Sequence, residues 1–345
     1  MTVVVKLGSS LVTDGGGRVR RRLLAARAAD LAAIVRAGER ACVVSSGAIA
    51  LGTPLLGLAR RPRTTPQLQA ASAAGQVRLQ LAWETALRAE GLRTAQVLLS
   101  ASDLAERASY VNVRNALDAL LRLGVIPVVN ENDATATDEI TFGDNDALAA
   151  QVAVLLGARL LVLLTEVDGV YSAHPAEPGA TALPSGDAVA GAEIGRRGEL
   201  GRGGMKSKIA AARLAAGAGI PTVIASGRGD GVVAAIAAGE ARGTHFPPAG
   251  ETPSAFRLWL RHAKPTAGRL VVDDGARAAL LGGGGSLLAV GVAGCEGSFA
   301  AGDAVELVAL DGTVLGKGIA GAGADELRHR PRGVEAVHRD RLVLY

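Results

Sequence analysis

The sequence has few aromatic residues and few cysteines, and each shortage argues against a class of protein. Only 3% of its 345 residues are Phe, Trp or Tyr, which disfavours a nucleic-acid surface built on stacked rings. The two cysteines, Cys42 and Cys295, are too few for a disulfide framework or a cysteine-based metal cluster. The first residues read as a strand without a signal segment, and no apolar run reaches membrane-spanning length. We therefore expect a cytoplasmic protein without a membrane span.

Two common nucleotide-binding motifs are also missing. The first apolar run is not followed by G-x-G-x-x-G, and no G-x-x-x-x-G-K-[ST] occurs in the chain. These absences argue against a dinucleotide-binding fold of the standard type and against a P-loop. Any nucleotide must then be bound by another arrangement.

The residues that are present predict a large α/β domain. With 49% hydrophobic residues, the chain can bury a large core. Up to residue 243, apolar runs typical of parallel strands alternate with segments in which apolar residues recur at helical spacing. This alternation predicts a three-layer αβα fold around a doubly wound, mostly parallel sheet. The expected strands lie near 2–7, 41–44, 95–99, 125–129, 159–164 and 221–225, and the main helices near 20–37, 66–90, 110–123 and 203–216.

After residue 243 the composition changes. Residues 244–265 contain two adjacent prolines and a Lys-Pro pair and are interpreted as a linker, so the expected domains are 1–243 and 266–345. We expect a chain that ends near Arg242 to fold and to keep the first domain's activity within about tenfold. In residues 266–345, short Val/Leu runs between Asp-Gly and Gly-rich turns predict a small β-barrel. Its strands are expected near 269–272, 287–292, 304–310, 313–319 and 333–344.

The most polar stretch of the chain is residues 128–150, which hold six carboxylates and three asparagines without a basic residue. It joins the end of an apolar run to a helix that opens with Asp144-Asn145-Asp146. Open α/β sheets bind ligands at the carboxyl ends of their strands, so this stretch is a candidate site. The stretch alone leaves open a solvated loop in which Asp and Asn serve as caps and turns.

Lysine is scarce, since only five of the 37 basic residues are lysine and 32 are arginine. Three of the five, Lys6, Lys206 and Lys208, lie in Gly-rich segments next to strand or helix ends. Lysine serves phosphoryl groups as a compact point charge. The small-residue turn at 45–47 follows the second strand and could hold an anion on its amides, or it could simply cap a helix.

Together these loops suit the transfer of a phosphoryl group, in which cations and amides stabilise charge that spreads over the transferring oxygens. Lys6 and Lys208 could clamp the phosphate, Asp146 could fix both lysines, and the remaining acids could help hold Mg²⁺. The alternative is that each lysine makes only a local ion pair. None of the five histidines lies in these loops. A carboxylate nucleophile is ionised without a base, so the missing base favours formation of an acyl phosphate.

A series of motifs resembles one known family over essentially the whole chain. The motifs are VVVKLGSS, SSGAI, VVNENDA, FGDNDALAA, LLTEVDGVY and GGMKSK, followed by LVVDDGA and residues 334–340. In this order they resemble the glutamate 5-kinases of the amino acid kinase superfamily, with a C-terminal barrel similar to a PUA domain. Single motifs are shared with aspartate, acetylglutamate, carbamate and uridylate kinases, whereas VNENDA, GDNDALAA and the barrel are more selective.

The resemblance implies ATP-dependent phosphorylation of the L-glutamate γ-carboxylate, the first step of proline biosynthesis. It assigns Lys6 and Lys208 to the transferring phosphoryl group, with Asp146 organising them. It assigns Ser46, Asp133 and Asn145 to glutamate, and the carboxylate of Asp133 suits the α-ammonium group. The implied ATP-binding residues are Lys6, Thr165, Glu166, Arg202, Gly203, Gly204, Met205, Lys206, Ser207 and Lys208. Mg²⁺ as companion of ATP, feedback by proline and a homo-oligomeric state are further expectations from the resemblance.

Two positions depart from the family's usual pattern. Glu166 stands where the family usually has aspartate, and Lys206 stands where it usually has a small residue. A different class of function is an RNA-binding or regulatory protein that acts through the barrel. Residues 266–345 carry 8 basic and 10 acidic residues, and the resulting charge of −2 suits a phosphate backbone poorly. The kinase is therefore the leading hypothesis.

Overall fold

The computed structural model describes residues 1–135, 145–191, 204–249, 255–283 and 285–345. The chain divides into two compact units, Met1–Thr252 and Pro253–Tyr345. Among the described residues, no helix is both long and apolar enough to cross a membrane.

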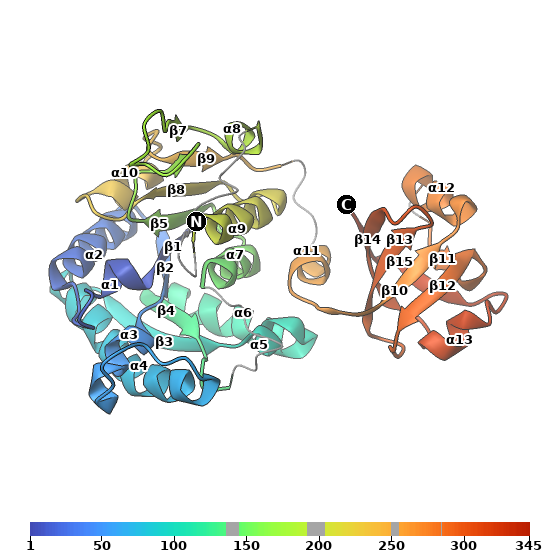
Figure 1. Cartoon of the computed structure of the whole chain (residues 1–345), viewed down its shortest axis with the longest axis horizontal. Helices are drawn as coiled ribbons and strands as arrows, with labels where there is room; N and C mark the ends of the chain where they lie inside the picture. Colours follow the sequence, from blue (N-terminus) through green and yellow to red (C-terminus); the bar gives the residue numbers. More distant parts are fainter. Residues whose placement is uncertain (136–144, 192–203, 250–254, 284) are drawn as a thin grey trace. The chain divides into compact units, whose positions relative to one another are not determined.

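The first unit is built on a seven-stranded sheet (Figure 1). All neighbouring strands are parallel except the last pair, which is antiparallel. This arrangement confirms the prediction of a doubly wound, mostly parallel sheet. In spatial order the strands are β3 (Arg93–Leu99), β4 (Val125–Glu131), β2 (Arg40–Ser45), β1 (Thr2–Leu7), β5 (Leu160–Thr165), β8 (Thr222–Ser226) and β9 (Thr244–Phe246).

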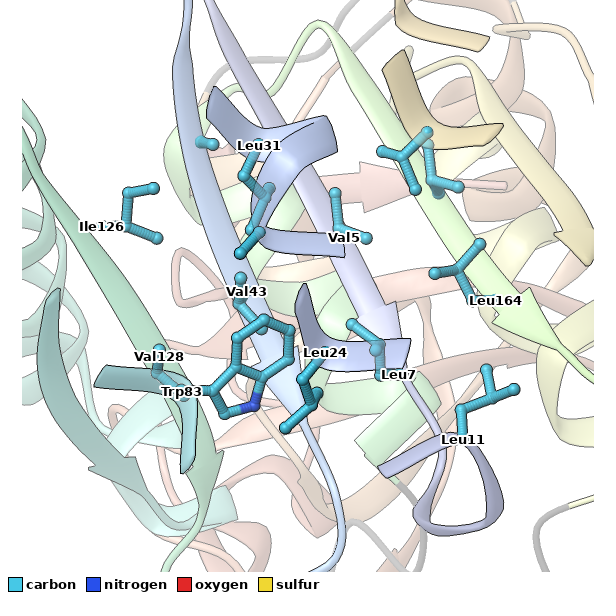
Figure 2. Close-up of a cluster of buried hydrophobic side chains, with 14 of the residues drawn as sticks. Val5, Leu7, Leu11, Leu24, Leu31, Val43, Trp83, Ile126, Val128 and Leu164 are labelled. Atoms are coloured by element: carbon cyan, nitrogen blue, oxygen red, sulfur yellow. The ribbon is translucent and has the colours of Figure 1, made fainter. Parts of the chain in front are cut away.

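Helices cover both faces of this sheet and make three layers. On one face, a cluster of buried apolar side chains joins the strands to Leu24 and Leu31 of α2 and to Trp83 of α4 (Figure 2). The opposite face is covered by helices that contact β1, β4, β5 and β8. The first set comprises α2 (Arg21–Arg36), α4 (Thr65–Ala89) and α10 (Val232–Ala237), and the second α6 (Arg107–Arg122), α7 (Asn145–Leu156) and α9 (Met205–Gly217).

Strand β1 places apolar side chains on one face of the sheet and a lysine on the other. Val3, Val5 and Leu7 belong to the apolar cluster shared with α2 and α4. Successive side chains of a strand point to opposite faces, so Lys6 lies on the other face, toward α7. The alternation that builds the core therefore also brings one lysine to the start of α7.

Short elements complete the first unit. They are α1 (Ser9–Val12), α3 (Ala48–Gly52), the 3₁₀ turn η1 (Pro54–Leu56), α5 (Ala101–Ala105), β6 (Val170–Tyr171), β7 (Ala182–Leu183) and α8 (Gly186–Gly191). The helix expected from residue 110 begins earlier, because the Glu106 side chain accepts the N–H groups of Ala108 and Ser109 and caps α6.

Helices α3 and α4 cross in backbone contact. A Cβ atom at Gly75 would lie 1.9 Å from the carbonyl oxygen of Ala48 and 2.5 Å from the nitrogen of Gly52. A Cβ atom at Gly52 would lie 1.7 Å from the carbonyl oxygen of Ala71. Only glycine fits at both positions, and the crossing fixes α4 beside the end of β2.

We expect Gly75→Ala to destabilise the protein, although alanine is normally the better helix residue. The added methyl group meets backbone atoms that can move only if α3 shifts, and such overpacking costs about 1–3 kcal/mol. Urea denaturation measures the loss. The matched control is Gly217→Ala at the end of α9, where a Cβ atom meets nothing within 4 Å. Equal midpoints for the two variants would contradict the close crossing.

The second unit contains a six-stranded sheet with the strand order β11-β15-β14-β13-β10-β12 (Figure 1). Its strands are β10 (Thr266–Val272), β11 (Leu287–Leu288), β12 (Val292–Gly297), β13 (Ala304–Ala309), β14 (Val314–Ala320) and β15 (Glu335–Leu344). Its helices are α11 (Ala255–His262), α12 (Asp274–Gly283) and α13 (Ala324–Arg328), with a 3₁₀ turn η2 (Ala289–Gly291). The Asp-Gly pair at 274–275, read as a turn in the sequence, begins α12, because the Asp273 carboxylate accepts the Ala276 N–H at 2.8 Å.

The segment interpreted as a linker, 244–265, contains structure that belongs to both units. Strand β9 pairs with β8, and Thr244 is fully buried. The Thr244 hydroxyl accepts the N–H of Val170 and donates to the carbonyl of Leu183. Helix α11 packs on β14 and β15 of the second unit. A chain ending at Arg242 would lose an edge strand of the first sheet, so the expected boundary at 243 lies too early.

Candidate active site

The carboxyl ends of β1, β2, β4 and β5 border a cavity of about 730 Å³. Parallel neighbouring strands end at the same edge of the sheet, which is why residues far apart in the chain meet here. Seven residues selected from the sequence line this cavity, namely Lys6, Ser46, Asp133, Asn145, Thr165, Glu166 and Lys208.

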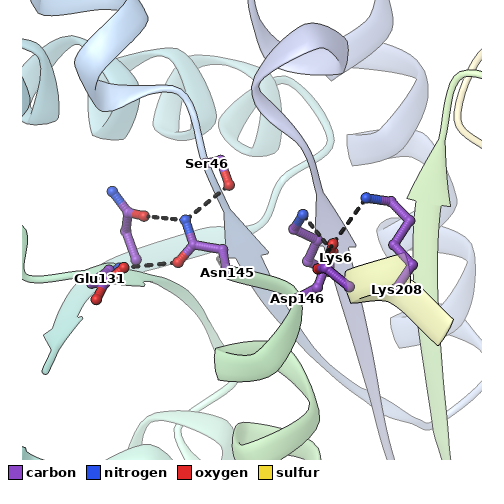
Figure 3. A network of polar contacts seen from close by, with 8 residues as sticks. Lys6, Ser46, Glu131, Asn145, Asp146 and Lys208 are labelled. Atoms are coloured by element: carbon purple, nitrogen blue, oxygen red, sulfur yellow. Dashed lines mark hydrogen bonds and ion pairs between the residues drawn. The ribbon is translucent and has the colours of Figure 1, made fainter. Parts of the chain in front are cut away.

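Two lysines from distant parts of the chain are held on one aspartate (Figure 3). The Lys6 Nζ lies 2.5 Å from Oδ1 of Asp146, and the Lys208 Nζ lies 2.9 Å from Oδ2. Lys6 is the penultimate residue of β1, Asp146 lies in the first turn of α7, and Lys208 is the fourth residue of α9. The Ser207 hydroxyl donates a further hydrogen bond to Asp146 Oδ2 at 3.0 Å. One carboxylate thus fixes the positions of both cations.

The three charges are almost completely shielded from water. Asp146 is 0% exposed, Lys6 2% and Lys208 6%. Burial alone would raise the pKa of Asp146, but the adjacent Lys6 and Lys208 outweigh it and hold that pKa below its ordinary value. Two cations and one anion leave a net positive charge, which favours an anionic ligand at the cavity.

Asn145 belongs to a chain of amide hydrogen bonds. Its Nδ2 donates to the Ser46 hydroxyl at 2.8 Å and to Oδ1 of Asn130 at 2.9 Å, while its Oδ1 accepts the Glu131 N–H (Figure 3). Asn130 donates in turn to Oε1 of Gln76 on α4 at 2.8 Å. The chain connects β4, α7 and the β2–α3 turn, so the Ser46 hydroxyl has a defined place at the cavity wall.

The β2–α3 turn depends on one glycine. Gly47 has a φ of 124°, which lies in the region that favours glycine, and its Cβ would approach Val12 at 3.1 Å. The turn therefore presents Ser46 beside Asn145 without a side chain in between.

Asp133 lies at the end of β4 and accepts a hydrogen bond from the Ser72 hydroxyl of α4 at 2.5 Å. Burial raises the pKa of Asp133, while the Ser72 hydrogen bond and the charge of Arg61 oppose that rise. The carboxylate is thus partly desolvated, as suits a group that binds a cationic ligand.

The end of β5 and the residue that follows it form the other side of the cavity. Thr165 accepts the N–H of Gly227 at 2.8 Å through its carbonyl. The carboxylate of Glu166 is paired with Arg228 and accepts from the Ser10 hydroxyl, and these contacts, against the opposing effect of burial, lower its pKa. Glu166 is therefore an ionised group at the rim of the cavity.

Of the expected ATP-binding segment, Gly204–Lys208 is described and Arg202 and Gly203 lie outside the described residues. Gly204 is the N-cap of α9, and a helix N-terminus is a favourable place for phosphate. Lys206 is exposed and is absent from the cavity lining of the described residues, unlike Lys208 two residues later. Gly204, Met205 and Ser207 do not line it either.

The described carboxylates do not form a site for the expected Mg²⁺ by themselves. Within the described part of the chain, no group of three or more His, Cys, Asp or Glu side chains could hold a metal ion. Both oxygens of Asp146 are engaged by the lysines. The described side chains do not fit a metal site made by protein alone, so the oxygens of the nucleotide would have to supply most ligands, as is usual for Mg²⁺ with phosphates.

Three contributors to this site were missed in the sequence, because they come from α4 and the loop before it. Ser72 and Gln76 are one helical turn apart and face Asp133 and Asn130. Arg61 acts on Asp133 by its charge. The available signal was a pair of neutral polar residues at i and i+4, both of which are buried, within the Ala-rich part of α4.

Known proteins are similar to this sequence over nearly the whole chain. The profile of the amino acid kinase family matches residues 1–226, and that of the PUA domain matches residues 268–340. The glutamate 5-kinase of Sphingopyxis alaskensis is 45% identical, over 99% of this chain and 97% of that protein. The glutamate 5-kinase of Myxococcus xanthus is 44% identical, over 99% of this chain and 96% of that protein. A solved isopentenyl phosphate kinase shares the fold, with a TM-score of 0.52 and 23% identity over 71% of this chain and 100% of that one.

The first unit is an amino acid kinase, as its three-layer fold, its two buried lysines on one aspartate and the matched profile show. The second unit is a PUA domain, as its profile shows. The relatives that match the chain over nearly its whole length identify the family within this class. The chain belongs to the glutamate 5-kinase family.

Proposed function

We propose that this chain transfers the γ-phosphoryl group of ATP to the γ-carboxylate of L-glutamate, giving L-glutamyl 5-phosphate for proline biosynthesis. The single observation that carries the proposal is the placement of two buried lysines on opposite oxygens of Asp146. This arrangement suits a reaction whose main demand is to stabilise charge on transferring oxygens. The membership of the glutamate 5-kinase family identifies the acceptor.

In the proposed reaction, a γ-carboxylate oxygen attacks the γ-phosphorus atom and the bond from that phosphorus to the bridging oxygen of ADP breaks. No proton has to be removed from the nucleophile. Lys6 and Lys208 stabilise the charge on the transferring oxygens. The negative charge of Asp146 offsets the repulsion between the two ammonium groups and so holds both of them at the site. Ser46 and Asn145 orient the acceptor carboxylate, and Asp133 binds the α-ammonium group.

Binding of ATP at Thr165, Glu166 and the start of α9 is part of the same proposal. Mg²⁺, bound to the phosphates of ATP, would neutralise part of their charge. A cytoplasmic location, a homo-oligomeric state and feedback by proline also belong to the proposal, on the strength of the family alone.

The direct test of the acceptor is ATP consumption with a panel of substrates. Glutamate, aspartate, N-acetylglutamate, carbamate and UMP are each offered at equal concentration with ATP and Mg²⁺. We expect ADP formation to depend on L-glutamate and to be lower by about a hundredfold or more with the others, since aspartate is one methylene too short to reach both ends of the site and the other three lack the α-ammonium group. Preferred turnover of any other acceptor would overturn the proposal.

We expect Asp133→Ala to raise the KM for glutamate by about tenfold or more, as for loss of a charged hydrogen bond to the ground state. The KM for ATP should change little, because Asp133 follows β4, whereas the residues assigned to ATP lie at the end of β5 and at the start of α9. Steady-state kinetics with each substrate varied in turn measures both constants. An increase confined to the KM for ATP would remove Asp133 from the glutamate site.

We expect a chain of residues 1–249 to keep glutamate-dependent ATP turnover within about tenfold, a change of ~1.4 kcal/mol in the barrier. This chain keeps β9 and the hydrogen bond from the Ala249 N–H to the Ala216 carbonyl. The matched control is residues 1–242, which lacks β9 and should melt at a lower temperature. A folded but inactive 1–249 chain would mean that the second unit takes part in the activity, as the RNA-binding or regulatory alternative requires.

A further inference from the structure

Glutamate carries three charged groups, and the proposed function assigns partners to only two of them. The γ-carboxylate lies toward the lysines, and the α-ammonium group is assigned to Asp133. The α-carboxylate has no assigned partner. A cation would balance its charge, and Lys6 and Lys208, which are held on Asp146, are assigned to the transferring phosphoryl group.

The loop between η1 and α4 supplies other cations to the same cavity. Arg60, Arg61 and Arg63 all line it together with Asp133. Pro62 between them is buried and fixes the loop to the protein, whereas the three arginines are exposed. Their guanidinium groups are therefore available at the cavity wall.

The position of this loop distinguishes the two substrates. In the sheet, β4 and β5 lie on opposite sides of the β2–β1 pair. Asp133 follows β4, and Thr165 and Glu166 end or follow β5. The loop leads directly into α4, whose Ser72 hydroxyl binds Asp133. The arginines thus belong to the amino-acid side of the cavity and not to the nucleotide side.

One of the three arginines acts on Asp133 itself. Burial raises the pKa of Asp133, and the positive charge of Arg61 opposes that rise, while neither Arg60 nor Arg63 is among the groups that shift it. Of the three arginines, Arg61 therefore has the electrostatic influence on Asp133, the residue assigned to the α-ammonium group.

We propose that Arg61 binds the α-carboxylate of the amino-acid substrate while Asp133 binds its α-ammonium group. Both groups of the substrate are attached to one carbon atom, so they require an anion and a cation that border the same cavity, as Asp133 and Arg61 do. A guanidinium can bind a carboxylate through two parallel hydrogen bonds. This inference rests on the proposed function, and it makes Arg61 a determinant of specificity for α-amino acids.

The test removes the α-carboxylate from the substrate and the guanidinium from the protein in turn. 4-Aminobutanoate is glutamate without its α-carboxylate and keeps the ammonium group and the reactive carboxylate. For Arg61→Gln we expect the KM for L-glutamate to rise by about tenfold or more, the usual scale for a charged hydrogen bond. The constant for 4-aminobutanoate should change less than about threefold, because that compound has nothing for Arg61 to bind.

The kinetic constant measured for 4-aminobutanoate is its KM. If its turnover is too slow to measure, the constant is its inhibition constant in competition with glutamate. Arg61→Lys should recover part of the affinity for glutamate, since it restores the charge but not the fork. Arg63→Gln, in the same loop, is the matched control and should have a smaller effect than Arg61→Gln.

Four results would overturn the assignment of Arg61. These are an unchanged KM for glutamate in Arg61→Gln, an equal loss with glutamate and 4-aminobutanoate, a rise confined to the KM for ATP, and a larger effect from Arg63→Gln. Failure of the proposed function looks different, since the unchanged protein would then show no glutamate-dependent turnover. An active wild type with an indifferent Arg61→Gln variant would refute Arg61 alone.

Discussion

Replacing Lys208 by alanine should lower kcat by about a hundredfold or more, the scale found when one group that stabilises transition-state charge is removed. The KM for glutamate should change much less, because Lys208 contacts Asp146 and the cavity beside it and is assigned to the transferring group. Rapid-quench measurement of a single turnover would show whether the loss lies in the chemical step.

The same helix offers a matched control for this experiment. Lys206 precedes Lys208 by two residues, is exposed and is absent from the described cavity lining. Lys206→Ala should therefore reduce kcat far less than Lys208→Ala. A near-normal kcat for Lys208→Ala, or equal losses for the two variants, would remove Lys208 from the mechanism.

Replacing Asp146 by asparagine should both destabilise the protein and abolish turnover. The change leaves Lys6 and Lys208 buried without their shared anion, and breaking a buried ion pair in this way costs about 3–5 kcal/mol. Chemical denaturation measures the loss. Since the folded pKa of Asp146 lies below its ordinary value of 3.8, its stabilisation is complete above that pH. The gap between wild type and Asp146→Asn should narrow as the pH falls through the lowered folded value.

A double substitution separates the two roles of Asp146. Asp146→Asn combined with Lys208→Met removes one cation together with the anion, so it should be more stable than Asp146→Asn alone. It should remain inactive, because a charge needed by the transferring group is gone. Additive losses of stability would show that the two residues are not coupled, against their 2.9 Å contact.

The first sheet could be predicted because its central strands β1, β2 and β5 are mostly apolar and are buried on both faces. Strand β9 could not, because it has only three residues in a Pro-rich segment and is defined by its antiparallel pairing with β8. Helix α12 was missed for a related reason, since its opening Asp-Gly pair is also a turn signal. In both places the local sequence is compatible with two structures, a strand or a loop at β9 and a helix or a turn at the start of α12. Contacts outside the local segment decide which one forms.

The sheet-edge residues of the site could be predicted because parallel strands bring their carboxyl ends together, and the structure does bring Lys6, Ser46, Asn145, Asp146 and Lys208 into contact with one another in two clusters. The contributions from α4 could not. They depend on the close crossing of α3 and α4 at two glycines, which no local pattern reveals.

The most direct measurement follows the oxygen atom that forms the new bond. The protein is incubated with ATP and with L-glutamate that carries ¹⁸O in its γ-carboxylate, and hydroxylamine cleaves the product at its acyl carbon. Phosphate released in this way keeps the bridging oxygen. Attack by the γ-carboxylate predicts one ¹⁸O in each phosphate, together with the hydroxamate of glutamate. Formation of ADP with unlabelled phosphate and no hydroxamate would mean that water is the acceptor, and it would contradict the assignment of this site to carboxylate phosphorylation.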